Sequence, residues 1–197
     1  MRTNTRITWP TICIFGDSIV RGGNDSQGGW VARLQRHFLK RPEIYNLGVS
    51  GDTADLISQR FDAEAAARNP RAIVIAAGVN HCPGIHGMPD TWLEDFRKSY
   101  DELVQKALQV TGKVLVLEVT SVDEATQTDD FAKDSEVQQL NQAIQAIAQK
   151  YRTELLVTYD LLSATDLADG LHPNDYGHEK LFEAALNKLV ALGWDKL

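Results

Sequence analysis

The sequence is poor in cysteine and lacks the spacings that usually give cysteines a structural or metal-binding role. Only 2 of the 197 residues are cysteines, and neither Cys13 nor Cys82 belongs to a CxxC pair or a zinc-like spacing. No apolar stretch of signal-peptide length follows the basic segment 1–6. A disulfide scaffold is therefore excluded, and we expect a protein of the reducing cytoplasm.

Long apolar runs and an excess of basic charge are also missing. The richest apolar run, 72–77, ends at Gly78 and is far shorter than the roughly 18 to 20 residues that span a membrane. The formal net charge is −7, from 20 basic and 27 acidic residues. We therefore expect no stable membrane insertion and no nucleic-acid partner, because an acidic surface repels phosphates.

The composition is that of an ordinary globular protein. Hydrophobic residues make up 43% of the chain, and a chain of 197 residues can bury a core without disulfides or metals. We find no internal repeat, no low-complexity tract and no linker rich in proline, glycine or serine. The sequence therefore predicts a single domain over residues 1–197.

Apolar periodicity predicts strands that alternate with helices. Five apolar runs have strand length, and they cover residues 11–15, 44–47, 72–77, 114–119 and 155–158. Helical spacing is clearest in four sets: Trp30, Leu34 and Phe38; Trp92, Phe96, Tyr100, Leu103 and Ala107; Val137, Leu140, Ile144 and Ile147; Leu181, Ala185, Leu189 and Leu192. Strands that are apolar throughout indicate a parallel sheet covered on both faces, which is the doubly wound α/β fold class.

Polar residues mark the ends of several predicted elements. We expect Asp90 to cap the helix that contains Trp92, and we expect Asn174 to begin the last helix. The segment 121–136 is long, polar and acidic, and it follows the fourth strand. It could be a lid over a site or a solvated connection, and the sequence leaves both open.

A set of chemically complementary residues follows the predicted strands. Ser18 comes after the first strand, Gly51 after the second and Asn80 after the third, and Asp169 and His172 come after the fifth. Ligand sites in open α/β sheets form at the carboxyl ends of the strands. We therefore expect these residues to meet at one edge of the sheet.

Together these residues can carry out acyl transfer. A serine hydroxyl needs a histidine to accept its proton and a carboxylate to orient that histidine, and Ser18, His172 and Asp169 can take these roles. The negative charge of the tetrahedral intermediate needs hydrogen-bond donors. The candidate donors are the backbone N–H groups of Ser18 and Gly51 and the side-chain amide of Asn80. This chemistry requires neither cofactor nor metal.

The same residues carry a family resemblance. Four blocks in order, Gly16-Asp17-Ser18-Ile19, Ser50-Gly51-Asp52-Thr53, Gly78-Val79-Asn80 and Asp169-Gly170-Leu171-His172, resemble those of the SGNH, or GDSL-type, serine hydrolases. The likeness extends from Thr11 to about Gly177. It implies a flavodoxin-like three-layer α/β/α sandwich with a five-stranded parallel sheet, and it gives the triad and the oxyanion donors the roles stated above.

The resemblance also implies a substrate class. We expect a serine hydrolase that cleaves a carboxylic ester or thioester of a small molecule or lipid through an acyl-enzyme. A carbohydrate acetyl esterase or an acyltransferase on the same fold is the alternative. A flavodoxin-like nucleotide- or flavin-binding module is a further alternative, although the chain has no phosphate-binding loop pattern.

One position departs from the family pattern. The third block usually reads GxND, whereas His81 occupies the place of the aspartate here. Because Asn80 is present, we expect activity to survive, although an inactive relative that serves as a binding scaffold remains an alternative. We expect His81 and Trp30 to contact substrate, with the segment 22–29 as a flexible rim of the acyl pocket. The loop 80–89 could equally be a connection with incidental polar residues.

Two structural interpretations compete with the catalytic one. Ser18 could merely cap a helix, and Asp17 is expected to brace its loop as a hydrogen-bond acceptor. The run Asp169, His172, Asp175 and His178 could be read as a metal cluster, although its spacing matches no usual zinc signature.

Overall fold

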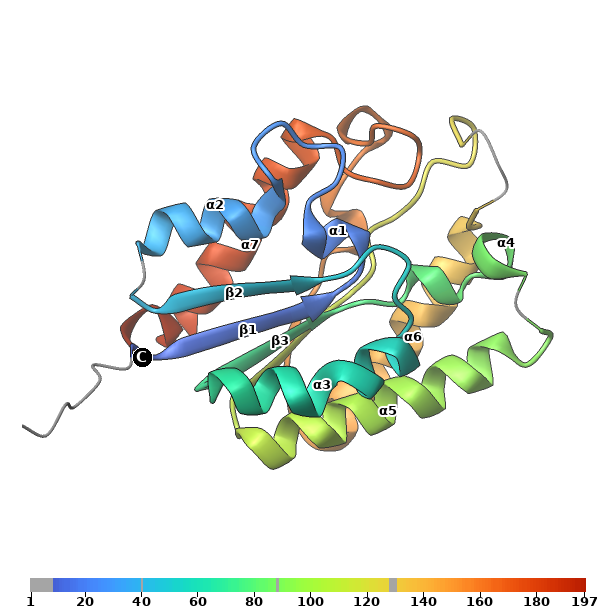
Figure 1. Cartoon of the computed structure of the whole chain (residues 1–197). Helices are drawn as coiled ribbons and strands as arrows, with labels where there is room; N and C mark the ends of the chain where they lie inside the picture. The colour runs from blue at the N-terminus through green and yellow to red at the C-terminus, as the bar shows by residue number, and fades with distance from the viewer. Residues whose placement is uncertain (1–8, 40, 88, 128–130) are drawn as a thin grey trace, which may run out of the picture.

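Five parallel strands form the centre of the molecule (Figure 1). In the computed structural model, which describes residues 9–39, 41–87, 89–127 and 131–197, they follow the order β2-β1-β3-β4-β5. Their bounds are β1 (Thr11–Gly16), β2 (Glu43–Gly48), β3 (Ala72–Ala76), β4 (Val114–Leu117) and β5 (Glu154–Leu156). Each predicted strand agrees with these bounds to within two residues at either end. The predicted parallel sheet is confirmed.

Helices cover both faces of this sheet. Figure 1 shows α2 (Gly29–Phe38) and α7 (Asp175–Ala191) on one face, and α3 (Ala54–Arg68), α5 (Trp92–Val110) and α6 (Asp134–Tyr151) on the other. The short elements are α1 (Ser18–Arg21), η1 (Val79–His81), α4 (Pro83–His86), η2 (Tyr159–Leu161), η3 (Ala164–Asp166) and η4 (Trp194–Lys196). The three-layer α/β/α sandwich is therefore confirmed.

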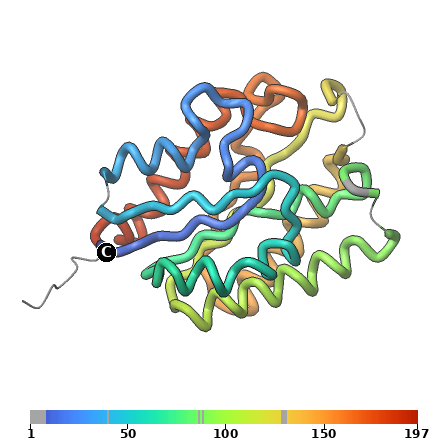
Figure 2. Tube along the Cα trace, viewed as in Figure 1, coloured from blue at the N-terminus to red at the C-terminus, as the bar shows by residue number. Residues whose placement is uncertain are grey.

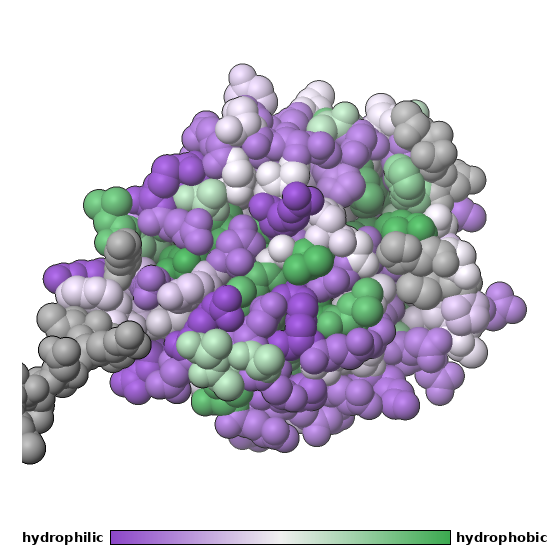
Figure 3. All heavy atoms as spheres, viewed as in Figure 1, coloured by the Kyte–Doolittle hydropathy of each residue, from purple (hydrophilic) through white to green (hydrophobic). Residues whose placement is uncertain are grey.

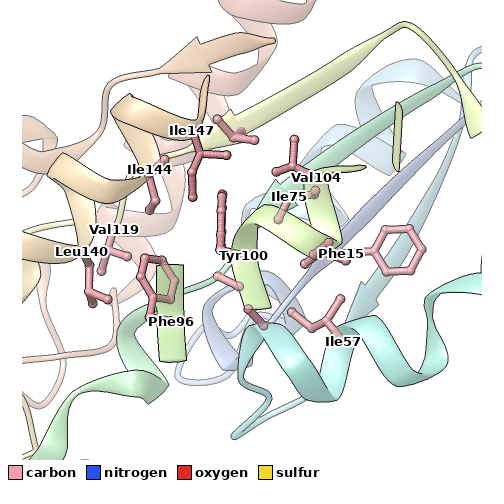
Figure 4. Close-up of a cluster of buried hydrophobic side chains, with 14 of the residues drawn as sticks. Phe15, Ile57, Ile75, Phe96, Tyr100, Val104, Val119, Leu140, Ile144 and Ile147 are labelled. Atoms are coloured by element: carbon pink, nitrogen blue, oxygen red, sulfur yellow. The ribbon is translucent and has the colours of Figure 1, made fainter. Parts of the chain in front are cut away.

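Two apolar clusters, one on each face of the sheet, hold the layers together. Because side chains alternate along a strand, Cys13 and Phe15 of β1 join the cluster under α3, α5 and α6, whereas Ile12 and Ile14 join the cluster under α2 and α7. Figure 4 shows the first cluster, in which Tyr100 of α5 lies among residues of α6 and the sheet. This two-sided burial explains why the central strands β1, β3 and β4 are almost wholly apolar, whereas the edge strands β2 and β5 are only partly buried.

One expected helix cap needs correction, and one helix was not predicted. The helix α5 begins after Thr91, not after Asp90, and the Thr91 hydroxyl donates a hydrogen bond to the carboxylate of Asp95 at 2.8 Å. The sequence analysis did not single out α3, because this helix carries an apolar residue, Leu56, on its exposed face as well as on its buried face. The expected cap at Asn174 is confirmed, since its side chain accepts the N–H groups of Tyr176 and Gly177.

The carboxyl ends of the strands bring distant segments together. Gly16 of β1 lies in register with Gly48 of β2 and with Ala76 of β3, so the chain leaves these three strands at the same level. Figure 2 shows the segment after β1, the segment after β4 and the segment before α7 gathered at this edge. In a sheet of this order the ligand crevice lies where the strand order reverses, between β1 and β3.

The outer surface is mostly polar. The face in Figure 3 is largely hydrophilic, with apolar residues in separate patches. Among the helices of the described chain, none combines the length and the apolar character that a membrane crossing requires.

Candidate active site

Ser18 is the first residue after the turn that ends β1. The chain turns at Asp17, and the Asp17 carboxylate, not the Ser18 hydroxyl, accepts the N–H of Ile19 at 2.9 Å. Asp17 therefore braces the turn, as expected, and the interpretation of Ser18 as a mere helix cap is wrong. The turn requires glycine before it, because a Cβ on Gly16 would lie 2.3 Å from the carbonyl oxygen of Ala76.

Ser18, His172 and Asp169 form a continuous relay of hydrogen bonds. The distance between Ser18 Oγ and His172 Nε2 is 2.9 Å, and the distance between His172 Nδ1 and Asp169 Oδ2 is also 2.9 Å. An ionised Asp169 can only accept, so Nδ1 carries the proton of the neutral ring and Nε2 is left to accept the serine proton. The side chains of His172 and Asp169 are 24% and 35% exposed, so a substrate can reach the relay.

Backbone groups keep the Asp169 carboxylate ionised. Burial disfavours its charge, but hydrogen bonds from the N–H and the ring of His172 and from the N–H of Leu171 outweigh burial and lower the pKa of Asp169. Both amide bonds go to Oδ1, at 2.7 Å from His172 and 3.1 Å from Leu171, which leaves Oδ2 for the ring. The carboxylate is thereby fixed in the orientation that the histidine needs.

The segment 22–29 rests against Asp169; we call it the strap. Asn24 Nδ2 donates to Asp169 Oδ2 at 3.4 Å, and Ser26 Oγ donates to Asp175 Oδ2 at 2.7 Å. The ends of the strap meet closely, because a Cβ on Gly22 would lie 2.2 Å from the carbonyl oxygen of Gly28. The expected flexible rim is thus a segment pinned to the loop that carries Asp169 and to α7.

Two charged residues add further anchors to the strap. Arg33 of α2 pairs with the carboxylate of Asp25 and, at 2.7 Å, with that of Glu179 in α7. Burial opposes the charge on Asp25, but the hydrogen bonds from Arg33 and from the N–H of Gly29 hold its pKa well below the usual range. His178 is fully buried; its ring accepts the N–H of Trp30 at 3.3 Å and lies 3.3 Å from the carbonyl oxygen of Gly23.

These contacts separate the four residues of the possible metal cluster. Asp169 and His172 belong to the relay with Ser18, Asp175 binds the strap, and His178 binds backbone groups. Among the residues that the structure describes, no group of three or more histidine, cysteine, aspartate or glutamate side chains could hold a metal ion. The geometry therefore favours the catalytic interpretation of this segment.

The three candidate oxyanion donors follow neighbouring strands, in the order β2-β1-β3. Ser18 begins α1, so its N–H has no acceptor within that helix. Gly51 has φ +83°, a conformation that favours glycine, although a Cβ there would meet nothing within 4 Å. Asn80 is buried and uses one amide hydrogen to bind the carbonyl oxygen of Asp52 at 3.0 Å, which leaves its other amide hydrogen as a donor.

An arginine that the sequence analysis did not select anchors the turn at Gly51. The Arg60 guanidinium in α3 pairs with Asp52 at 2.8 Å and donates to the carbonyl oxygens of Leu47, at 2.8 Å, and Gly16, at 3.4 Å. It thereby connects the ends of β1 and β2 to the residue that follows Gly51. No local sequence pattern marks this role, because the partners lie far from Arg60 along the chain.

The two residues expected to contact substrate are both buried. Trp30 is 1% exposed and packs in the apolar cluster with Leu34 and Leu181, so the prediction that it contacts substrate is corrected. It lines a small pocket of about 30 Å³ together with Asp17. His81 is 3% exposed, and its Nε2 accepts the N–H of Ala54 at 2.9 Å, so its ring braces the turn after Gly51.

The buried carboxyl of Asp17 makes the stability of the protein depend on pH. Its side chain is buried, and burial, the largest influence, raises its pKa from 3.8 to about 6. Between these values the folded protein binds a proton that the unfolded chain has released. This contribution to the free energy of unfolding is present below about pH 4, falls as the pH rises through 6, and amounts to ~3 kcal/mol.

We expect the substitution Asp17→Asn to remove this dependence. Urea unfolding measures the free energy of unfolding of both proteins. The value for the wild type minus the value for the variant should be lower by ~3 kcal/mol at pH 8 than at about pH 4. Asp160→Asn, at an exposed carboxylate, is the control and should show no such change. A difference between the wild type and Asp17→Asn that is the same at both pH values would contradict the assignment.

A three-layer α/β fold with a serine, histidine and aspartate relay at its carboxyl edge is the arrangement of a serine hydrolase. The sequence profile of the GDSL-like lipase/acylhydrolase family matches residues 14–180, and the chain belongs to this family. The predicted family is confirmed, and so is the predicted class, a hydrolase that acts on ester bonds.

Individual relatives agree with this assignment. The chain is 25% identical over 203 residues to the rat (Rattus norvegicus) isoamyl acetate-hydrolyzing esterase 1 homolog. This match covers 91% of the chain and 81% of the relative. The fold is similar to that of the lipase/acylhydrolase from Enterococcus faecalis, with a TM-score of 0.77 and 21% identity. The match covers 91% of this chain and 95% of the neighbour. It is also similar to that of the acetyl xylan esterase AlAXEase, with a TM-score of 0.75 and 20% identity. This match covers 91% of this chain and 99% of the neighbour.

Proposed function

We propose that the protein hydrolyses carboxylic esters of short acids through an acyl-enzyme on Ser18. The observation that carries the proposal is the relay in which Ser18 Oγ, the ring of His172 and the carboxylate of Asp169 are joined by two hydrogen bonds of 2.9 Å. A serine placed in this way loses its proton to the histidine as it attacks a carbonyl carbon.

In the acylation step Ser18 Oγ bonds to the ester carbonyl carbon while His172 Nε2 takes its proton. The carbonyl oxygen becomes negatively charged, and the donors at Ser18, Gly51 and Asn80 stabilise it. The intermediate collapses when the carbon–oxygen bond to the alcohol breaks and His172 returns the proton to the leaving oxygen. Ionised Asp169 stabilises the imidazolium between these two transfers.

In the deacylation step the same residues act on water. His172 Nε2 takes a proton from a water molecule as that water attacks the acyl carbon. The second tetrahedral intermediate expels Ser18 Oγ, which regains its proton from His172, and the carboxylic acid leaves. The cycle needs no other group, because the proton passes between the nucleophile, the histidine and the leaving group.

The proposal that the acyl group of the substrate is short comes from the names of the relatives. The rat relative is named for isoamyl acetate and the structural neighbour for acetyl xylan, so both names denote acetate esters. Their alcohols differ, one small and apolar and the other a polysaccharide. A sugar acetate is therefore the second candidate substrate, whereas the acyl group is the same in both candidates.

A surface groove next to the oxyanion glycine offers space for part of the substrate. The groove has a volume of about 530 Å³ and lies between the first turns of α3 and the middle of α5. Its lining comprises Gly51, Thr53, Asp55, Leu56, His81, Asp95, Lys98, Ser99 and Glu102. Leu56 is 42% exposed and supplies an apolar surface, while the charged residues are mainly acidic. We expect a neutral substrate to be preferred over an anionic one.

Chain length and alcohol can be varied independently to test the substrate. Hydrolysis of p-nitrophenyl esters from acetate to palmitate should give the highest kcat/KM at acetate or butyrate. Isoamyl acetate and acetylated xylo-oligosaccharides, compared by release of acetate, separate the two candidate alcohols. A maximum at long chains would contradict the short-acid proposal, and absence of hydrolysis of every ester would contradict the proposed function.

We expect the substitution Asn80→Ala to lower kcat at least about a hundredfold, because the loss of one oxyanion donor typically costs 10² to 10³ in kcat. Steady-state kinetics on p-nitrophenyl acetate measure the effect. The control for the loss of a buried amide is Asn141→Ala on α6, which removes two buried hydrogen bonds to Val119 in the segment after β4. Equal losses of kcat in the two variants would show that Asn80 acts on stability and not on the oxyanion.

The two cysteines support our proposal of a reducing compartment. Both Cys13 and Cys82 are free and buried, and burial raises the pKa of the Cys13 thiol to about 12. Such thiols are inert packing residues and form no nucleophile that competes with Ser18.

A further inference from the structure

We propose that His81 is a positioning residue for the oxyanion hole. Its ring holds the turn that carries Gly51, by accepting the backbone N–H of Ala54. The proposal rests on the proposed function, in which the N–H of Gly51 and the amide of Asn80 bind the oxyanion. It gives a role to the imidazole that stands where the family usually has an aspartate.

The contact joins two buried groups. The distance between Ala54 N and His81 Nε2 is 2.9 Å, and the two residues are 0% and 3% exposed. Ala54 is the first residue of α3, and the residue before it, Thr53, makes no side-chain capping bond to that helix. The Thr53 hydroxyl instead donates to Asp55. The imidazole therefore supplies an acceptor that the first turn of α3 lacks from its own cap.

His81 and Asn80 hold the same turn at two successive points. Asn80 donates to the carbonyl oxygen of Asp52 at 3.0 Å, and His81 accepts from Ala54 two residues further on. Both side chains come from η1, so the turn after β2 is fixed directly to the segment after β3. The two oxyanion donors, Gly51 N–H and Asn80 Nδ2, thus belong to one braced unit.

This bracing matters because oxyanion donors act only within a narrow range of positions. A displacement of about 1 Å in a catalytic group can cost about a hundredfold in rate, whereas substrate binding through other contacts is little affected. Without the His81 acceptor, the buried N–H of Ala54 would have to move toward another partner or stay unsatisfied. Either result shifts Gly51, which lies three residues earlier, or weakens the turn.

The ring itself is held in place for this role. His81 packs edge-on against Phe96 of α5, with ring centroids 5.0 Å apart. A ring nitrogen that accepts a hydrogen bond carries no proton, so the neutral ring of His81 has its proton on Nδ1. This is a specific tautomer, and it can be observed directly.

The test compares two variants of matched length. His81→Gln keeps an acceptor at about the position of Nε2, whereas His81→Met has a side chain of similar length without a comparable acceptor. With p-nitrophenyl acetate, we expect kcat of His81→Met to fall about tenfold or more with KM within about twofold, and kcat of His81→Gln to stay within about threefold of the wild type. Equal kcat values for His81→Gln and His81→Met would overturn the proposal.

A measurement on the wild type decides the matter if His81→Met does not fold. The ¹⁵N shifts of the histidine rings distinguish protonated from unprotonated nitrogens, and the signals of His81 are those that His81→Gln loses. An unprotonated Nε2 at neutral pH supports the proposal, and a protonated Nε2 overturns it. Hydrolysis that depends on Ser18 but is equal in all His81 variants would overturn this role and leave the proposed function intact.

Discussion

The substitution Ser18→Ala should lower kcat by about 10⁴-fold or more, because it removes the atom that forms the acyl-enzyme. KM should change little, since the serine hydroxyl contributes mainly to the chemical step. A fluorophosphonate probe gives an independent measurement. Ser18 Oγ attacks its phosphorus, fluoride leaves, and intact-protein mass spectrometry detects the adduct on the wild type and no adduct on the variant.

The matched control for this experiment is Ser135→Ala, at an exposed serine in the first turn of α6. It should keep the wild-type kcat and be labelled by the probe at the wild-type rate. If Ser18→Ala is labelled as fast as the wild type, another residue is the nucleophile. A folded wild-type protein that resists labelling and hydrolyses no ester would remove the enzymatic function itself.

The substitution Asp169→Asn should lower kcat about 10⁴-fold although the shape of the side chain hardly changes. The asparagine carbonyl can still accept the N–H groups of Leu171 and His172, which now bind Asp169 Oδ1. Its NH₂ group then faces His172 Nδ1 and donates to it. The ring must place its own proton on Nε2, so it can no longer accept the proton of Ser18.

The pattern of effects separates this tautomer argument from a loss of stability. Asp169→Asn should reduce the rate of fluorophosphonate labelling as strongly as it reduces kcat, while circular dichroism shows that the variant keeps the wild-type fold. Asp160→Asn, at an exposed carboxylate in η2, should change neither. If Asp169→Asn retains more than about a tenth of the wild-type kcat, Asp169 does not orient the histidine.

Local sequence patterns were sufficient to predict the layers of the fold. The central strands β1, β3 and β4 are recognisable because burial on both faces leaves no polar alternation. The helices α5 and α6 are recognisable because each has a single apolar stripe. The helix α3 escaped the analysis because Leu56 is apolar and exposed, which blurs the stripe. The sequence could not fix the ends of α5, because Asp90 and Thr91 both have side chains that favour a cap.

The hydrogen-bonded relay of Ser18, His172 and Asp169 could be predicted from residue chemistry combined with the expected topology, whereas the residues that support it could not. Ser18, Asp169 and His172 each follow a strand, and the carboxyl edge of the sheet was the expected meeting place. The roles of Arg60, Asn24 and His81 depend on contacts between segments that the sequence does not align. Trp30 was misassigned because an aromatic residue after a glycine-rich segment can equally face a site or begin a buried helix.

The proposed nucleophile, Ser18, and its proposed base, His172, lie 154 residues apart along the chain. A chain that emerges from the ribosome in order therefore exposes its serine 154 residues before its histidine. Contacts with distant segments orient the loop that bears Asp169 and His172, among them the bond from the Asp123 N–H to the carbonyl oxygen of Gly170 and the bond from Asn24 to Asp169. A chain that has not reached His172 lacks the proposed base, so the first hydrolysis in a refolding experiment reports the moment at which these distant segments have come together.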